Sequence, residues 1–266
     1  MSMEYNEGTS KIREILLEAG KLLLGEKENK LEIHAKTSQK DLVTQYDTMI
    51  QDYITTEIHN LIPNAQFISE ESQTGGSLDA DELFIIDPID GTTNFIHSMR
   101  YSAVSVAWYK KGKPYYGIVY NPYSNEIFEA EQGKGAFMNS QRLLIHDSLL
   151  QNSIVAFGTS PYNTETTDLT FELIKEIYGR CQDIRRMGSA ALDICQVAAG
   201  RIGLYFEAAL SLWDYAAAQL ILQEAGGILL NFEGSEIKLS TQKSSVIVGS
   251  KAIITESRLI RRENGI

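Results

Sequence analysis

Apolar residues recur at helical spacing near the start of the chain. Between Ile12 and Leu23 they lie mainly three or four positions apart, which predicts an amphipathic helix over residues 8–25. The same spacing predicts a second helix over residues 44–61, and Pro63 stops it.

The spacing then changes to that of strands. Apolar segments separated by short Gly/Lys or Asn-Pro turns occur at residues 83–87, 103–109, 115–120 and 126–130. Short turns between successive strands are typical of an antiparallel meander.

The second half of the chain alternates between the two spacings. Strands are expected over residues 153–158, 183–187, 203–207 and 245–249, and helices over 166–179, 189–199 and 213–225 and at the C-terminus. Hairpins followed by strand–helix alternation indicate two packed α/β subdomains, residues 1–146 and residues 147–266.

Composition excludes several classes of protein. The 266 residues are 43% hydrophobic, which is enough for a substantial core, and the formal net charge is −11. Such an acidic chain lacks the basic face that nucleic-acid binding requires, so no nucleic-acid partner is expected.

No segment favours export or a membrane. The N-terminus carries acids where a signal peptide carries bases, and the apolar residues 208–223 are too short for a span and contain Asp214. Cys181 and Cys195 form no C-x-x-C pair. We therefore expect a cytoplasmic protein with reduced, mostly buried thiols and no membrane contact.

The densest chemical signal is Asp-Pro-Ile-Asp-Gly-Thr-Thr-Asn at residues 87–94, directly after the apolar run Leu-Phe-Ile-Ile. The strand is expected to end at Asp87, where Pro88 breaks the ladder and Gly91 permits a tight turn. The residues from Thr92 onward are of the types that begin a helix, and N–H groups at a helix start bind anions.

The same turn offers oxygen ligands. Asp87, Asp90 and the carbonyl of Ile89 are groups that Mg²⁺ prefers, together with phosphate oxygens. Two acids at a helix start also suit the helix dipole without any metal, so the turn alone leaves both interpretations open.

Further acids favour the metal. Glu70 and Glu71 follow another short apolar segment, and Asp214 lies in an almost wholly apolar one, where an unpaired charge is costly. Their plain alternatives are a solvated loop and a helix cap. Asp47 lies within the second expected helix and is by default a surface acid.

Two known motifs that combine acids with glycine do not match the segment that begins at Asp87. An EF-hand loop counted from Asp87 requires Glu at its twelfth position, which is Ser98 here. The dehalogenase pattern D-x-D-G-T has one residue fewer between its acids. Neither spacing is met.

Residues 87–94 resemble the first signature of the inositol monophosphatase family. Trp-Asp-Tyr-Ala-Ala-Ala from Trp213, followed by Glu-Ala-Gly-Gly from Glu224, resembles the second. The resemblance extends to Lys36, to residues 41–47 and 69–71, and to Gly-Ser-Ala-Ala from Gly188, with Ser69 where many members have Gly. It implies an αβαβα layered sandwich, with an antiparallel sheet in the first half and an α/β sheet in the second.

The resemblance also implies roles for individual residues. Glu70, Asp87 and the Ile89 carbonyl would hold one Mg²⁺, and Asp87, Asp90 and Asp214 a second, with a weaker third site near Glu70. The catalytic residues would be Thr92, Asp47 and Glu70, and Thr92, oriented by Asp47, would help position and deprotonate the attacking water. The phosphate and the rest of the substrate would contact Gly91, Thr92, Gly188, Ser189, Ala190, Glu207 and Asp214.

The expected function is Mg²⁺-dependent hydrolysis of a small phosphorylated polyol, with inositol monophosphate as the leading substrate. The resemblance further implies a lithium-sensitive homodimer with two or three Mg²⁺ per active site. A 3′-phosphoadenosine or NADP-type nucleotide, or fructose 1,6-bisphosphate, is the alternative substrate. A non-catalytic metal-binding or interaction protein is the alternative of another class. Glu207 has an alternative of its own, an ion pair with Arg201 or with a nearby lysine.

Overall fold

The computed structural model describes residues 6–25, 33–35, 42–72, 75–161 and 164–261. Lys36 and Asp41, which contribute to the family resemblance, lie outside the described residues. The helices are α1 (Glu7–Gly25), α2 (Gln45–Leu61), α3 (Thr92–Ile96), α4 (Thr167–Tyr178), α5 (Ala190–Ala198), α6 (Leu212–Glu224) and α7 (Lys251–Ser257).

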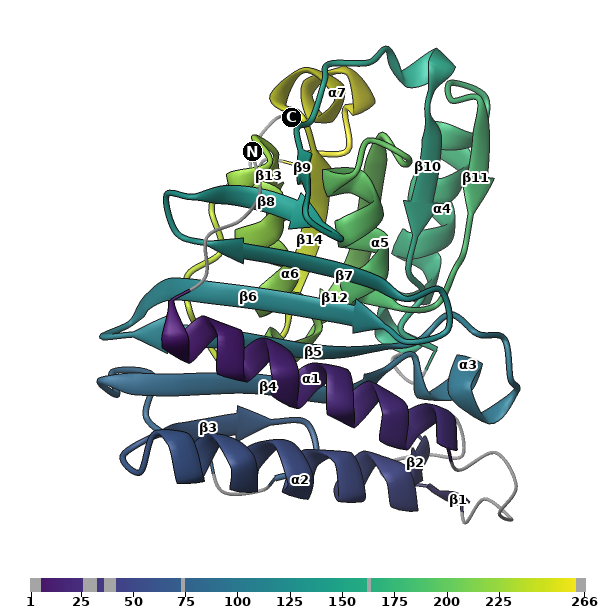
Figure 1. Ribbon diagram of the computed structural model, residues 1–266. Helices are drawn as coiled ribbons and strands as arrows, with labels where there is room; N and C mark the ends of the chain where they lie inside the picture. Colours follow the sequence, from purple (N-terminus) through teal and green to yellow (C-terminus); the bar gives the residue numbers. More distant parts are fainter. Residues whose placement is uncertain (1–5, 26–32, 36–41, 73–74, 162–163, 262–266) are drawn as a thin grey trace.

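Two large sheets lie between the helices (Figure 1). The first, in the order β3-β4-β5-β6-β7-β8-β9, consists of Gln66–Ser69, Glu82–Asp90, Ala103–Lys110, Lys113–Asn121, Glu126–Glu131, Gly135–Met138 and Gln141–Leu143. The second, in the order β11-β10-β12-β14-β13, consists of Asp183–Arg185, Ile154–Phe157, Leu204–Leu210, Ser244–Gly249 and Ile228–Leu230. Strands β1 (Ile33–Ala35) and β2 (Leu42–Thr44) pair separately.

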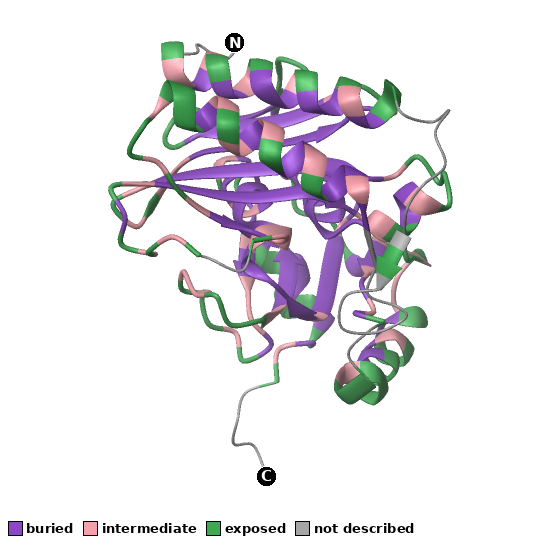
Figure 2. Cartoon of the chain, turned by 90° about the horizontal axis from the view of Figure 1, so that it is seen from below, coloured by how far each residue is buried: buried purple, intermediate pink, exposed green. Residues whose placement is uncertain are grey.

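Alternation of side chains along the strands produces five layers. In β4, Phe84 and Ile86 pack with α1 and α2, whereas Leu83 and Ile85 face the core that contains α5 and α6. Tyr205 of β12 joins that same central core from the second sheet, while its neighbours face α4 and α7. The expected αβαβα sandwich is confirmed, and Figure 2 shows the buried strands beneath the exposed outer faces of α1 and α2.

The predicted antiparallel meander is confirmed, and β8, β9 and β3 extend it beyond the four strands expected. Strands β4 to β9 form the antiparallel meander, and β3 adds to its edge in parallel. The second sheet is mixed, because β10 is parallel to β11 and β12 while β14 is antiparallel. The division into two subdomains stays a prediction, since the central core contains residues of both halves.

One boundary was wrong in a way that matters for function. The strand expected to end at Asp87 continues to Asp90, with a register shift against β5 between those two residues. Pro88 lies at the shift and cannot donate to the ladder, so the strand bulges instead of ending. Both carboxylates therefore belong to one strand.

Two features of the described residues bear on the cellular expectations. No described helix is long and apolar enough to cross a membrane. The two cysteines form no disulfide, and Cys195 is buried while Cys181 is partly exposed.

Helix α6 lies against the first sheet at unusually close range. A Cβ atom placed on Gly117 of β6 would be 2.6 Å from the carbonyl oxygen of Ala217 in α6. The backbone of α6, which begins two residues before Asp214, therefore depends on the missing side chain of Gly117.

We expect Gly117→Ala to lower the free energy of unfolding by about 1–3 kcal/mol, because the helix backbone must shift to admit the methyl group. Urea denaturation measures the loss. Gly179→Ala is the matched control, since no atom lies within 4 Å of a Cβ there, and its effect should stay within about 0.5 kcal/mol. Equal effects of the two substitutions would contradict the close packing.

Candidate active site

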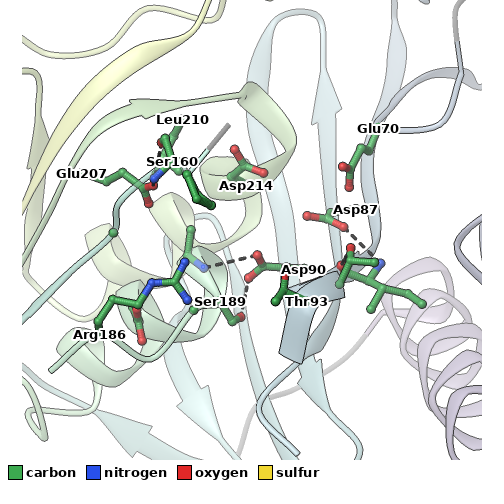
Figure 3. Close-up of a pocket in the computed structure, with 18 of the residues that line it drawn as sticks. Glu70, Asp87, Asp90, Thr93, Ser160, Arg186, Ser189, Glu207, Leu210 and Asp214 are labelled. Atoms are coloured by element: carbon green, nitrogen blue, oxygen red, sulfur yellow. Dashed lines mark hydrogen bonds between the residues drawn. The ribbon is translucent and has the colours of Figure 1, made fainter. Parts of the chain in front are cut away.

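One pocket of about 130 Å³ collects almost all residues singled out from the sequence. These are Glu70, Asp87, Ile89, Asp90, Gly91, Thr92, Gly188, Ser189, Ala190, Glu207 and Asp214. Asp47 does not line the pocket and lies behind it. The pocket is formed by the end of β4, the starts of α3, α5 and α6, and the bulged part of β12 (Figure 3).

Asp90 is tied to the start of α5. Its carboxylate accepts hydrogen bonds from the Ser189 hydroxyl, from the Ala190 N–H at 3.2 Å and from the Ala191 N–H at 2.7 Å. The exposed N–H groups of the first helical turn are thereby satisfied by a residue a hundred positions earlier in the chain. Burial raises the pKa of Asp90 to about 7, and these hydrogen bonds oppose the rise.

Asp214 combines the two roles that its sequence left open. Its carboxylate accepts the Ser211 N–H at 2.6 Å, so that Ser211 and Asp214 form the capping box of α6. It also lines the pocket, and burial raises its pKa well above the ordinary value, with the charges of Asp90 and Glu70 adding to the rise.

Asp47 is not the surface acid that its position in a helix suggested. It is fully buried, and its Oδ2 accepts the Thr44 N–H at 2.8 Å and the Thr44 hydroxyl at 2.6 Å in the capping box of α2. Its other oxygen, Oδ1, lies 3.3 Å from the Thr92 Oγ1 donor. The hydroxyl of Thr92 is also 3.1 Å from the Ile89 carbonyl.

Glu207 makes no ion pair with Arg201, which pairs with Glu126 instead. One oxygen of Glu207 accepts the N–H and the hydroxyl of Ser160 at 2.9 and 2.7 Å, and the other accepts the Tyr205 hydroxyl at 2.6 Å. Gly158 leaves the necessary space, because a Cβ there would collide with the carboxylate. The side chain is thus fixed by neutral donors at the pocket wall.

The pocket gathers buried negative charges that a bound cation would stabilise. Burial raises the pKa of Asp87 well above its ordinary value, and the next strongest influences, the charges of Glu70, Asp90, Asp214 and Asp47, all raise it further. Carboxylate oxygens are hard ligands, so this donor set fits Mg²⁺ in kind.

The carboxylate groups of the pocket point to different partners and not to one common point. Among the described residues, no three His, Cys, Asp or Glu side chains are grouped closely enough to hold a metal ion. The reason is visible in the contacts given above, since Asp90 turns to α5 and Asp214 to its own helix cap. Figure 3 shows Glu70, Asp87, Asp90 and Asp214 around the same space.

Besides Thr93 of the 87–94 motif, sequence reasoning missed four polar residues that line the pocket: Ser160, Arg186, Asp193 and Tyr205. A signal existed for two of them. Tyr205 lies two positions before Glu207 on a predicted strand and so faces the same side. Ser160 comes just after the strand expected over residues 153–158. Nothing local distinguished Arg186 from Arg185, or marked Asp193 within its helix.

Known proteins share this fold and about a third of the aligned residues. The structure of extragenic suppressor protein SuhB from Bartonella henselae superposes with a TM-score of 0.87 at 32% identity, covering 96% of this chain and 99% of that one. The 2′AMP-bound structure of SaIMPase-II gives 0.79 at 32% identity, covering 93% and 92% of the two chains, and the same protein is also known with inositol monophosphate.

Two curated relatives carry different names. Nus factor SuhB of Pasteurella multocida is 38% identical over 205 residues, 77% of each chain. Inositol monophosphatase 1 of Bos taurus is 34% identical over 247 residues, 90% of this chain and 88% of that protein.

The five-layered fold and its acid-lined pocket define a class of mixed α/β proteins that includes phosphatases. The model of the inositol monophosphatase family matches residues 5–264. The chain belongs to the inositol monophosphatase family.

We expect Mg²⁺ to raise the Tm more at about pH 8 than at about pH 5, because protons compete with a cation for raised-pKa carboxylates. The pKa of Asp90 rises from 3.8 to about 7 on folding. The metal-free folded state therefore binds more protons than the unfolded state, and its stability falls as pH rises through this interval. Thermal unfolding with Mg²⁺ or EDTA at both pH values measures the effect.

Asp87→Asn should abolish most of the Mg²⁺-dependent rise in Tm. Asp183→Asn is the control, since Asp183 is exposed and pairs with Arg185 outside the pocket. A rise that is the same in both variants would place the stabilising cation elsewhere.

Proposed function

We propose that this protein is a Mg²⁺-dependent phosphatase of small phosphate monoesters and that water attacks the phosphorus directly. Inositol monophosphate is the leading substrate. The observation that carries the proposal is the hydrogen-bonded series Thr44–Asp47–Thr92, which ends at a pocket lined by six carboxylates, among them the four expected metal ligands. A site that only binds metal has no need of a hydroxyl held by a buried acid.

The ligands would be divided between two cations. Glu70, Asp87 and the Ile89 carbonyl would hold the first, and Asp87, Asp90 and Asp214 the second, with a weaker third site near Glu70. Bound Mg²⁺ supplies a lowered pKa for a coordinated water and stabilisation of the charge on the phosphoryl oxygens.

Thr92 and Asp47 would take up the proton that the attacking water loses. Both donors from Thr44 go to one oxygen of Asp47, which leaves the other to accept from the Thr92 hydroxyl. In that arrangement the lone pairs of Thr92 Oγ1 face a water proton. As the water attacks, its proton moves to Thr92 Oγ1 while the hydroxyl proton moves to Asp47 Oδ1.

The phosphate would be held at the start of α3 by the N–H groups of Gly91 and Thr92. Gly91 has a φ of +89°, and a Cβ there would lie 3.0 Å from the carbonyl oxygen of Gly188. Only glycine fits this position without strain, so the two loops can approach each other across the pocket.

Glu207 would accept a hydrogen bond from a substrate hydroxyl. Ser160 and Tyr205 hold its carboxylate at the wall of the pocket, where an additional lone pair can accept from a polyol. The nucleotide alternative is supported by the bound 2′AMP in SaIMPase-II, a relative that also binds inositol monophosphate.

We expect purified protein to release phosphate from inositol monophosphate with Mg²⁺ and to lose this activity in EDTA. Asp90→Asn should lower kcat/KM at least about 100-fold, because it removes charge that holds a cation against the transition state. Asp183→Asn should retain full activity. Undiminished activity in EDTA would exclude metal-assisted hydrolysis.

The role of Thr92 is tested by two substitutions. Thr92→Val keeps the shape of the side chain but loses the hydroxyl, so kcat should fall about 100-fold while KM changes less than about threefold. Thr92→Ser should retain most of the activity. Hydrolysis in ¹⁸O-labelled water should invert a chiral phosphate, whereas retention or a trapped phospho-enzyme would contradict direct attack by water.

A further inference from the structure

The end of the pocket away from Glu70 and Asp87 contains a basic side chain (Figure 3). Arg186 is the only basic side chain among the described residues that line the pocket. Figure 3 shows it on the same side as Glu207 and Ser160, opposite Glu70 and Asp87. The carboxylate-rich end and the guanidinium therefore lie at different ends of one cavity.

The backbone makes room for this guanidinium. Gly188 has a φ of +96°, and a Cβ atom placed on it would collide with Nη1 of Arg186. The Arg186 side chain thus folds back across the loop that leads into α5 instead of extending away from it. A side chain at position 188 would displace it from the pocket.

The guanidinium of Arg186 makes few contacts within the protein. Among the described residues its one hydrogen bond runs from Nη2 to the Thr159 hydroxyl at 3.4 Å, and it forms no ion pair within 4.0 Å. The adjacent Arg185 differs, since it pairs with Asp183 and donates to the Ile184 carbonyl. Because a guanidinium has five N–H donors, Arg186 retains most of its capacity.

The acids near this end are already satisfied by other groups. Glu207 accepts from Ser160 and Tyr205. Asp193 accepts the Tyr101 hydroxyl at 2.9 Å. Burial raises the pKa of Asp193 and the charge of Arg186 partly offsets the rise, but neither carboxylate lies within the 4.0 Å of an ion pair with it. The guanidinium therefore keeps most of its donors for an anion that enters the pocket.

We propose that Arg186 binds a second anionic group of the substrate, so that the pocket accepts, besides inositol monophosphate, phosphomonoesters that carry a further phosphate. This inference rests on the proposed function, in which the scissile phosphate occupies the carboxylate-rich end. A planar guanidinium binds phosphate through two parallel hydrogen bonds. In a chain with a net charge of −11, a distal phosphate requires such a local cation.

The test compares two substrates that differ only in the distal phosphate, inositol 1-phosphate and inositol 1,4-bisphosphate, with phosphate release measured in Mg²⁺. Arg186→Ala should lower kcat/KM for the bisphosphate about 10- to 100-fold, mainly through KM, because a charge-assisted contact is lost. For the monophosphate the change should stay within about threefold. Arg186→Lys should give an intermediate loss, since Lys is charged but not bidentate.

Arg185→Ala is the matched control and should leave both substrates within about threefold of the wild type. The inference is overturned if Arg186→Ala lowers kcat/KM equally for both substrates, which indicates a general role in folding or in the metal site. It is also overturned if the bisphosphate shows no loss.

Binding separates this inference from the proposed function. If neither substrate is hydrolysed, the phosphatase proposal fails, and calorimetric titration with the bisphosphate in Mg²⁺ then decides the role of Arg186. The wild type should bind the bisphosphate at least about 10-fold more tightly than Arg186→Ala. Equal dissociation constants would overturn the inference on their own.

Discussion

Mutual repulsion among buried carboxylates is the constraint on which the arrangement of this molecule depends. Three acids of the pocket, Asp87, Asp90 and Asp214, accept hydrogen bonds from neutral donors. Ile89 donates to Asp87, the start of α5 to Asp90 and Ser211 to Asp214, while Asp47 behind the pocket is held by Thr44. Since backbone N–H groups at helix starts need acceptors anyway, the fold stabilises the acids and its helix ends with the same hydrogen bonds. Burial raises the pKa values of Asp87, Asp90 and Asp214, and neutral donors do not cancel the neighbouring charges that raise them further, which makes the pocket receptive to cations.

The layered fold brings these acids together from distant parts of the sequence. Asp87 and Asp90 come from the first sheet, and Asp214 comes from a helix of the central layer. The central layer can do this only because it contacts both sheets, and α6 contacts β6 closely enough to require Gly117. The bulge at Pro88 is equally necessary, because it carries the strand on from one acid to the next.

The sequence predicted the elements well and the contacts between them poorly, for a physical reason. Periodicity reports which residues of one element face a core, so the two long helices, the meander and the alternating second half were confirmed. It does not report which elements meet. Asp47 was therefore assigned to the surface although it is buried beneath Thr92, and the link from Asp90 to α5 spans about a hundred residues. Arg186 had no local signal, since its role depends on Gly188 and on the loop's path across the pocket.

Relatives at similar identity carry the names of a Nus factor and of a phosphatase, so membership of the family does not by itself select an activity. The distinction must come from residues that a given activity needs and another does not. The capping acids stabilise helices whether or not a reaction occurs. Their presence therefore does not distinguish a phosphatase from a relative without that activity. The Thr92 hydroxyl is different, because it caps no helix. It lies within hydrogen-bond distance of the Ile89 carbonyl and of Asp47 Oδ1, and the contact with Asp47 fits proton transfer. Catalysis therefore requires this contact in a way that it does not require the helix-capping roles of the surrounding carboxylates.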